Sequence, residues 1–176
     1  MANLSNFIPP PHPEGITLEG QLVRLEPLDS KKYAQQLFES NSEEGGERNW
    51  TYLPYGPFNA VSDYSDWLRS IEGLPDPVFF TIIRKEDGKA VGVASYLRIN
   101  PNEGSIEVGH INFSPSLQRT AEATETMFLM MQWAFNSGYR RYEWKCNAKN
   151  VKSRKAAQRL GLSYEGVFRQ ASISKG

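Results

Sequence analysis

The sequence predicts an α+β domain with a mixed, mostly antiparallel sheet, helices on both faces and one β-α-β crossover. Its 176 residues suffice for one hydrophobic core, and 39% hydrophobic with 23% charged residues is ordinary for a globular protein. Strand-like segments follow one another from Val78 to Phe113, which predicts an antiparallel meander. A long helical pattern then separates two further strands, and a crossover of this kind makes those strands parallel.

Composition and charge exclude several classes of protein. The formal net charge of +0 favours neither nucleic acid nor an anionic membrane as a partner. No apolar run approaches the roughly 20 residues that span a bilayer, and the N-terminus has no signal-peptide pattern. The single cysteine, Cys146, excludes an intrachain disulfide and suits a reducing compartment. We therefore expect a soluble cytoplasmic protein that binds neither nucleic acid directly nor membrane.

The chain begins with a proline-rich segment, residues 1–15, which predicts an extended arm; residues 16–176 form the single domain. Ile16–Leu28 alternates around Gly20, which indicates two short strands or one bent strand. Asp29 or Ser30 then caps a helix of about ten residues whose inward face includes Tyr33, Leu37 and Phe38.

Residues 41–58 form a long loop that is rich in aromatic side chains and glycine. Long loops inside compact domains are often functional, but this one could also be a flap that covers the core. Asn59 is the expected cap of a helix over Ala60–Ile71, whose apolar side chains at helical spacing form a buried stripe.

The meander and the crossover complete the domain. The expected strands are Val78–Arg84, Ala90–Ile99, Ser105–Phe113, Tyr139–Cys146 and Ser163–Gln170. A long helix after residue 120 has an inward face of Met127, Met130, Met131, Ala134 and Phe135, and a short basic helix covers Val151–Leu160. The element order is β, α, α, β, β, β, α, β, α, β.

The stretch from Ser105 to Thr124 carries the clearest functional signal. A strand breaks at Ser114-Pro115-Ser116 and leads directly into the long helix. The first backbone N–H groups of a helix lack internal partners and lie at the positive end of its dipole. Such a turn binds anions, and phosphate above all.

Three groups of residues resemble the GNAT superfamily of acetyl-CoA-dependent N-acetyltransferases, and its RimJ/RimL-like branch in particular. They are the opening LEGQLVRLEPLD, the turn Gln118 to Ala123 at the family pattern Gln/Arg-x-x-Gly-x-Gly/Ala, and Asn147-x-x-Asn150-x-x-Ser153 with a following Leu-Gly-Leu and Glu-Gly. The likeness runs from about Ile16 to Arg169. It implies an acyltransferase that moves acetyl from acetyl-CoA, used as a co-substrate with no metal, to a primary amine in a ternary complex.

The resemblance also implies which residues hold acetyl-CoA. Backbone amides of the turn would bind the pyrophosphate, and the strand end would pair with the pantetheine arm. Asn147 and Asn150 would contact the arm, although asparagines in turns also act as helix caps. Lys149, Lys152, Arg154 and Lys155 could help to hold the 3′-phosphate or form a solvated helix face. The full cofactor set is Asn112, Phe113, Ser114, Gln118, Arg119, Thr120, Ala121, Glu122, Ala123, Thr124, Asn147, Asn150 and Ser153.

Two catalytic residues follow from the same resemblance. Glu107 is the first candidate for the base that deprotonates the amine, directly or through a water, although it could instead be a charge on a solvated strand face. Ser153 would donate a proton to the departing thiolate. His110 is the second candidate base, but an odd spacing from Glu107 puts the two on opposite faces unless a bulge intervenes.

Two departures from the family pattern define the alternative function. Arg119 and Ala121 stand where glycine is common, and Gln170–Gly176 is too short and polar to supply the family's last strand. A sheet edge left open there favours association, such as a homodimer. The alternative to the enzyme is a non-catalytic CoA-binding or protein-interaction module that retains the fold. The acceptor is either a protein N-terminus or a small amine, and an acidic run at Glu43, Glu44 and Glu47 could attract its positive charge.

Overall fold

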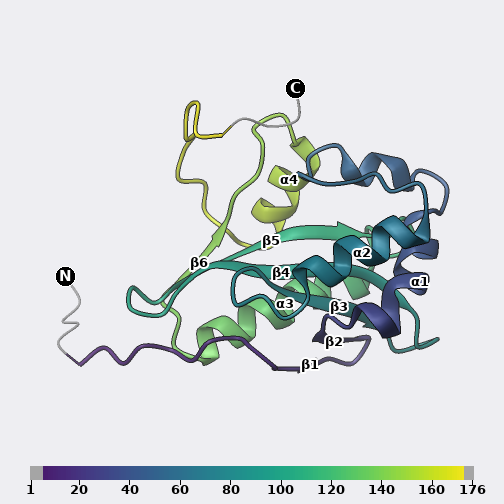
Figure 1. Ribbon diagram of the computed structural model, residues 1–176. Helices are drawn as coiled ribbons and strands as arrows, with labels where there is room; N and C mark the ends of the chain where they lie inside the picture. The colour runs from purple at the N-terminus through teal and green to yellow at the C-terminus, as the bar shows by residue number, and fades with distance from the viewer. Residues whose placement is uncertain (1–5, 173–176) are drawn as a thin grey trace.

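The computed structural model describes residues 6–172, and its six strands form one sheet in the order β1-β2-β3-β4-β5-β6 (Figure 1). Every neighbouring pair is antiparallel except β5 and β6, which are parallel, as predicted for the strands on either side of the long helix. The strands are β1 (Leu18–Glu19), β2 (Val23–Pro27), β3 (Val78–Arg84), β4 (Ala90–Asn100), β5 (Ser105–Phe113) and β6 (Arg141–Trp144). The mixed α+β architecture is confirmed.

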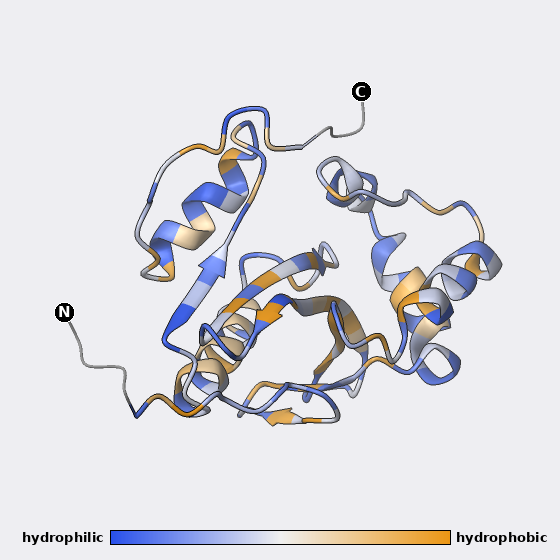
Figure 2. Ribbon diagram, turned by 60° about the vertical axis from the view of Figure 1, so that its left-hand side comes forward, coloured by the Kyte–Doolittle hydropathy of each residue, from blue (hydrophilic) through white to orange (hydrophobic). Residues whose placement is uncertain are grey.

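Helices cover both faces of this sheet. One face packs against α1 (Ser30–Asn41) and α2 (Val61–Ile71), with Leu37, Tyr64 and Phe79 in a shared core. The other face packs against α3 (Ala121–Asn136), where Met130 and Ile106 are fully buried. A short 3-10 helix, η1 (Gly46–Trp50), lies within the aromatic loop, and α4 (Val151–Arg159) follows β6. Figure 2 shows that α4 and β6 are predominantly hydrophilic and stand at one side of the apolar core.

Local sequence signals place most helix ends correctly. Asp29 caps α1 by accepting from the Lys32 backbone N–H at 2.9 Å, as predicted. The cap of α2 is Ala60 and not the predicted Asn59, and Ala60 makes no side-chain cap bond. On α3, Phe135 was expected to face inward but is 50% exposed, and its ring contacts Tyr142 of β6.

The proline-rich arm packs against the domain over part of its length. Pro10 and Pro13 are buried, and the Tyr139 hydroxyl donates to the Pro11 carbonyl at 3.0 Å. Residues 1–5 lie outside the described part of the chain. The arm therefore contacts the segment that follows α3.

The expected strand at Ser163–Gln170 is wrong. A strand requires a ladder of backbone hydrogen bonds to a neighbour, and within residues 6–172 this segment forms none. Tyr164 and Phe168 are each 73% exposed. Arg141 holds the segment beside β6 through its ion pair with Glu165 at 2.6 Å. The predicted tail 170–176 lies partly outside the described residues.

Two β-bulges turn side chains toward one region of the sheet. Gly109 pairs with Ser95 and Asn112 with Val93, so His110 and Ile111 of β5 together lie opposite Ala94 of β4. A second register shift lies in β4 at Arg98, whose N–H donates to the Asp76 carboxylate at 3.0 Å. Both bulged residues, His110 (φ 49°) and Arg98 (φ 47°), adopt left-handed backbone. Bulges of this kind often lie beside active sites.

The side chain of Glu125 connects α3 to the turn between β1 and β2. Glu125 accepts hydrogen bonds from the backbone N–H groups of Gln21, Leu22 and Val23 at 2.7–2.9 Å. A Cβ on Gly20 would lie 2.5 Å from the same carboxylate, so glycine is needed for this close approach. Burial raises the pKa of Glu125, but the three backbone donors together lower it by more. The pKa of Glu125 therefore lies below its ordinary value.

We expect Glu125→Gln to lower the free energy of unfolding at neutral pH by about 1–2 kcal/mol, since charge-assisted hydrogen bonds are lost. Because the folded pKa is depressed, the contribution is complete above the ordinary pKa of a glutamate and disappears as pH falls through the folded pKa. Urea unfolding at several pH values measures it. Glu122→Gln on the same helix is the control, and an equal pH-dependent loss in both variants would contradict this role of Glu125.

Candidate functional site

The strand-turn-helix from β5 to α3 leaves backbone N–H groups available at the start of α3. The Leu117 and Gln118 N–H groups close the turn by donating to the Ser114 carbonyl. Thr120 caps α3 by accepting from the Ala123 N–H at 3.1 Å. In the described part of the chain, the backbone N–H groups of residues 119–122 have no protein acceptor. They are available to an anion at the positive end of the helix.

Arg119 shows why glycine is common at this position. Its φ is 64°, in the left-handed region where glycine is favoured, so the arginine tolerates a strained backbone. Strain at one residue costs of order 1–3 kcal/mol and is typical of functional turns. The side chain of Ala123 is buried in the core, so only its backbone could serve the site.

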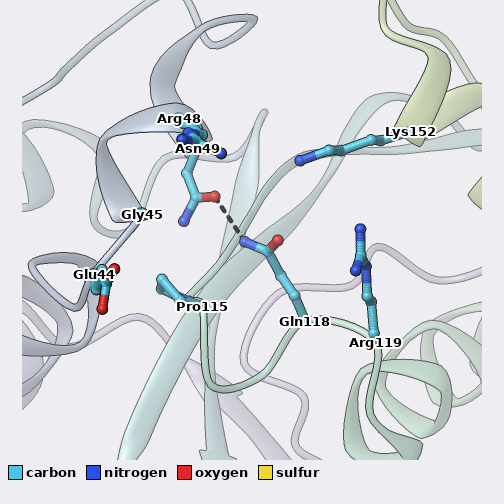
Figure 3. Close-up of a pocket in the computed structure, with 8 residues that line it drawn as sticks. All are labelled: Glu44, Gly45, Arg48, Asn49, Pro115, Gln118, Arg119 and Lys152. Carbon is cyan, nitrogen blue, oxygen red and sulfur yellow. Dashed lines mark hydrogen bonds between the residues drawn. The ribbon is translucent and has the colours of Figure 1, made fainter.

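A cavity of about 220 Å³ opens beside this turn. Three elements bring positive charge to it: Arg48 from η1, Arg119 from the turn and Lys152 from α4, against the single carboxylate of Glu44. Figure 3 shows Arg119 and Lys152 reaching into the same space above Gln118. The lining residues are Glu44, Gly45, Arg48, Asn49, Pro115, Gln118, Arg119 and Lys152.

The aromatic loop fixes the end of β5. The Asn49 and Gln118 side chains both donate to the Phe113 carbonyl, at 2.8 and 2.9 Å, and Gln118 also donates to Asn49 (Figure 3). Glu43 accepts from the Ser116 N–H and hydroxyl at 2.9 and 3.0 Å. Within the acidic run, Glu43 therefore holds the turn and Glu44 lines the cavity. Asn49 was missed because its partners are distant in sequence.

Within residues 6–172, no strand lies beside the outer edge of β5 beyond Val108. Trp144 pairs with Val108 at the last shared position of β5 and β6, while β5 continues to Phe113. The side chains of Asn112 and Ser114 are buried, at 1% and 0% exposure. Neither amide atom of Asn112 has a hydrogen-bond partner among the described residues. Part of the backbone is occupied too, because the Phe113 carbonyl accepts from two side chains and the Ser114 N–H donates to the Val91 carbonyl. The edge of β5 that stays open to a ligand therefore ends at Asn112.

The three predicted polar residues after β6 lie together at the start of α4. Asn150 caps α4 by accepting from the Ser153 N–H at 3.1 Å, and Asn147 accepts from the Lys149 N–H at 2.9 Å. The Ser153 hydroxyl accepts from the indole N–H of Trp144 at 2.9 Å. Cys146, expected to be a buried strand residue, is exposed and lies beyond the end of β6.

Glu107 is buried and fully engaged by positive charges. Arg98 contacts one carboxylate oxygen at 2.7 Å and Lys145 contacts the other at 2.5 Å. Lys145 also binds Glu143, which in turn pairs with Arg141. The alternative that Glu107 is a charge on a solvated strand face is therefore excluded.

The bulge in β5 brings His110 to the face of the sheet that Glu107 occupies. The ring stacks on Tyr55 with centroids 5.7 Å apart, contacts Phe79 at 5.1 Å, and its Nδ1 lies 3.2 Å from the Tyr55 hydroxyl. Burial lowers the pKa of His110; Arg98 lowers it further, whereas Glu107 raises it. The imidazole is therefore neutral at physiological pH and able to accept a proton.

The aromatic loop covers the core, one of the two alternatives that its sequence suggested, and it also contacts His110 and the segment before α4. Trp50 is buried and packs on Phe58 and Tyr64, so part of the loop covers the core. Tyr55 reaches His110, and the Tyr52 hydroxyl donates to the Lys149 carbonyl at 3.1 Å, which links the loop to the segment before α4. The density of aromatic residues was the signal for this contact with the site.

Comparisons with known proteins agree with this geometry. Residues 22–163 match the family model described as acetyltransferase (GNAT) domain. An uncharacterized N-acetyltransferase p20 from Bacillus licheniformis is 27% identical over 131 residues, which cover 71% of this chain and 72% of that protein. None of the helices in residues 6–172 is long and apolar enough to cross a membrane.

Solved structures give the same result. A GCN5-related N-acetyltransferase from Brucella melitensis has a TM-score of 0.95 and 42% identity, over 98% of this chain and 79% of that one. A probable GNAT acetyltransferase from Chromobacterium violaceum has a TM-score of 0.91 and 35% identity, over 99% and 87%. The fold extends at 17% identity to the ribosomal-protein acetyltransferase RimL (TM-score 0.74, over 97% and 93%). The chain belongs to the GNAT family of acetyltransferases.

Proposed function

We propose that this protein is an N-acetyltransferase that moves acetyl from acetyl-CoA to a primary amine by direct attack in a ternary complex. The observation that carries the proposal is the position of the anion site. Free backbone N–H groups and three cationic side chains lie at the end of β5, beside its unpaired strand edge. A ligand with a pyrophosphate and a peptide-like arm fits both features.

The residues present fit acetyl-CoA. The N–H groups of residues 119–122 would bind the pyrophosphate, and Arg119 and Lys152 would neutralise its charge. The outer edge of β5 up to Asn112 would pair with the pantetheine amides, and Asn147 and Asn150 would face it from the start of α4. The Phe113 carbonyl and the Ser114 N–H already have partners, so these two residues would line the end of that edge.

The residues that would transfer the amine proton are on the sheet face that carries Glu107 and His110. We assign the amine proton to the neutral His110 imidazole, and to Glu107 the task of stabilising the imidazolium that forms, since its charge raises the His110 pKa. The two cations that contact Glu107 hold that carboxylate in place. Ser153 would donate a proton to the sulfur of CoA as it leaves.

The acceptor would approach past the aromatic side chains around His110. Tyr55, Trp67 and Phe79 form a wall there, with Tyr55 and Trp67 centroids 4.2 Å apart. The fold-level likeness to RimL supports a protein N-terminus as one class of acceptor, and small amines are the other.

Calorimetric titration with acetyl-CoA tests the binding half of this proposal, with CoA and adenosine 3′,5′-bisphosphate as comparators. We expect micromolar binding that needs both pyrophosphate and pantetheine. A screen of peptides with free N-termini and of small amines then tests transfer. Binding without transfer to any amine favours the alternative, a non-catalytic CoA-binding or interaction module. The observation that supports this non-catalytic alternative is that residues 163–170 do not form the strand expected of the family.

A homodimer is a further part of the proposal. The apolar side chains of Tyr164, Val167 and Phe168 are exposed beside β6, and a second copy could cover them. Light scattering at several concentrations tests it, and a monomer at all of them would contradict it.

We expect Asn150→Ala to weaken acetyl-CoA binding about tenfold, because it removes both an amide that faces the arm and the cap of α4. Asn150→Asp is the matched control, since aspartate keeps the cap but has no amide donor. If the aspartate variant binds normally while the alanine variant does not, Asn150 acts only as a cap. Titration calorimetry measures both.

A further inference from the structure

Trp144 is the last residue of β6 and lies where the pairing of β5 with β6 ends, a place that we call the gap between β5 and β6. It pairs with Val108 at the last shared position, and its ring packs partly buried against the core. Its indole N–H donates to the Ser153 hydroxyl oxygen at 2.9 Å. The tryptophan therefore connects the strand that ends at the gap with the helix that begins there.

Ser153 is fixed from two directions. Its backbone N–H donates to the Asn150 side chain, and its hydroxyl oxygen accepts from Trp144. Serine and threonine in helices often donate to a carbonyl four residues earlier, as Thr124 and Thr126 do in α3. Among the described residues, the Ser153 hydroxyl proton has no such acceptor.

The donor inventory of these two side chains determines the direction of the hydrogen bond. An indole N–H can only donate, whereas a hydroxyl has one proton and accepting lone pairs. Because Trp144 occupies a lone pair of Ser153, the hydroxyl proton is left for a third partner. A residue that accepted from Ser153, such as a glutamate, would instead have consumed that proton.

We propose that Trp144 is a positioning residue that commits Ser153 to donating its proton toward the leaving sulfur. This inference rests on the proposed acetyl transfer. As the C–S bond breaks, its electron pair passes to sulfur, and the Ser153 O–H hydrogen-bonds to the developing thiolate. The thiol proton comes through Ser153, which regains one from solvent, so the serine is unchanged at the end of the cycle.

A double-mutant cycle tests the coupling. We expect Trp144→Phe to lower kcat about three- to tenfold, the value of one hydrogen bond, with little change in the Kd for acetyl-CoA. Ser153→Ala should lower kcat at least as much, and Trp144→Phe should add nothing in the Ser153→Ala background. Additive losses would overturn the proposal, since a purely structural role of Trp144 does not depend on Ser153. Tyr142→Phe, on the same strand and face, is the control.

The ionisation of bound CoA gives a readout that needs no turnover. A hydrogen bond from Ser153 favours the thiolate, so the pKa of the CoA thiol, followed by thiolate absorbance, should fall on binding to the wild-type protein. Trp144→Phe and Ser153→Ala should each reduce that fall. A pKa unchanged between wild type and both variants would overturn the proposal even if acetyl transfer is observed. CoA that binds without any acetyl transfer would contradict the proposed function instead.

Discussion

His110→Gln is expected to lower kcat by about 10²- to 10⁴-fold, the usual contribution of a positioned general base. It should also remove the acid limb of the pH–rate profile while leaving the Kd for acetyl-CoA unchanged. The physical reason is that His110 combines a neutral imidazole with a fixed orientation, held between Tyr55 and Phe79 by the bulge in β5. Glutamine keeps a polar side chain there but cannot take up a proton.

Glu107→Gln separates the two candidates on that face. Because Glu107 raises the pKa of His110, its loss should shift the acid limb of the pH–rate profile to lower pH without abolishing it. If Glu107→Gln abolishes the limb and His110→Gln retains it, Glu107 is the base. His12→Gln replaces the other histidine of the chain and should leave the profile unchanged.

Reversal of charge in the cavity should have the second largest effect. We expect Arg119→Glu to weaken acetyl-CoA binding about 10- to 100-fold, since a charge-assisted contact to phosphate is lost and a like charge is added. Binding of acetyl-pantetheine, which lacks the pyrophosphate, should not change. Titration calorimetry at two salt concentrations measures both ligands.

The controls come from the same region. Lys155→Glu changes an exposed cation on α4 that does not line the cavity, and it should alter affinity little. Glu44→Gln removes the carboxylate in the lining and should strengthen binding. Equal losses from Arg119→Glu and Lys155→Glu would mean that only the overall field matters and that the cavity is not the phosphate site.

The elements of this fold were predictable because their signals are local. The Asp29 cap, the meander and the crossover helix each depend on residues within one segment, and the parallel pairing of β5 with β6 follows from connectivity. The strand predicted at Ser163–Gln170 failed for the opposite reason. Alternation makes a strand possible, but pairing requires a neighbour that the segment itself does not contain.

The site was predictable only in part. The turn before α3 and the Asn150 cap follow from short motifs, whereas the position of His110 depends on a register shift against β4. Similarly, the ion pairs on Glu107 join residues 9 and 38 positions away. Such contacts arise from the way strands align, and no spacing within β5 reveals them.

The hydrogen bond from Tyr52 to the Lys149 carbonyl links the aromatic loop to the segment that precedes α4. A neutral bond of this kind contributes about 1 kcal/mol, so its opening is frequent and its two states are close in energy. A ligand that shifts the start of α4 would therefore also change the position of the aromatic loop. In the ternary complex that we propose, this link would couple the order of substrate binding to the shape of the loop, since the first substrate to arrive would select the conformation that the second meets.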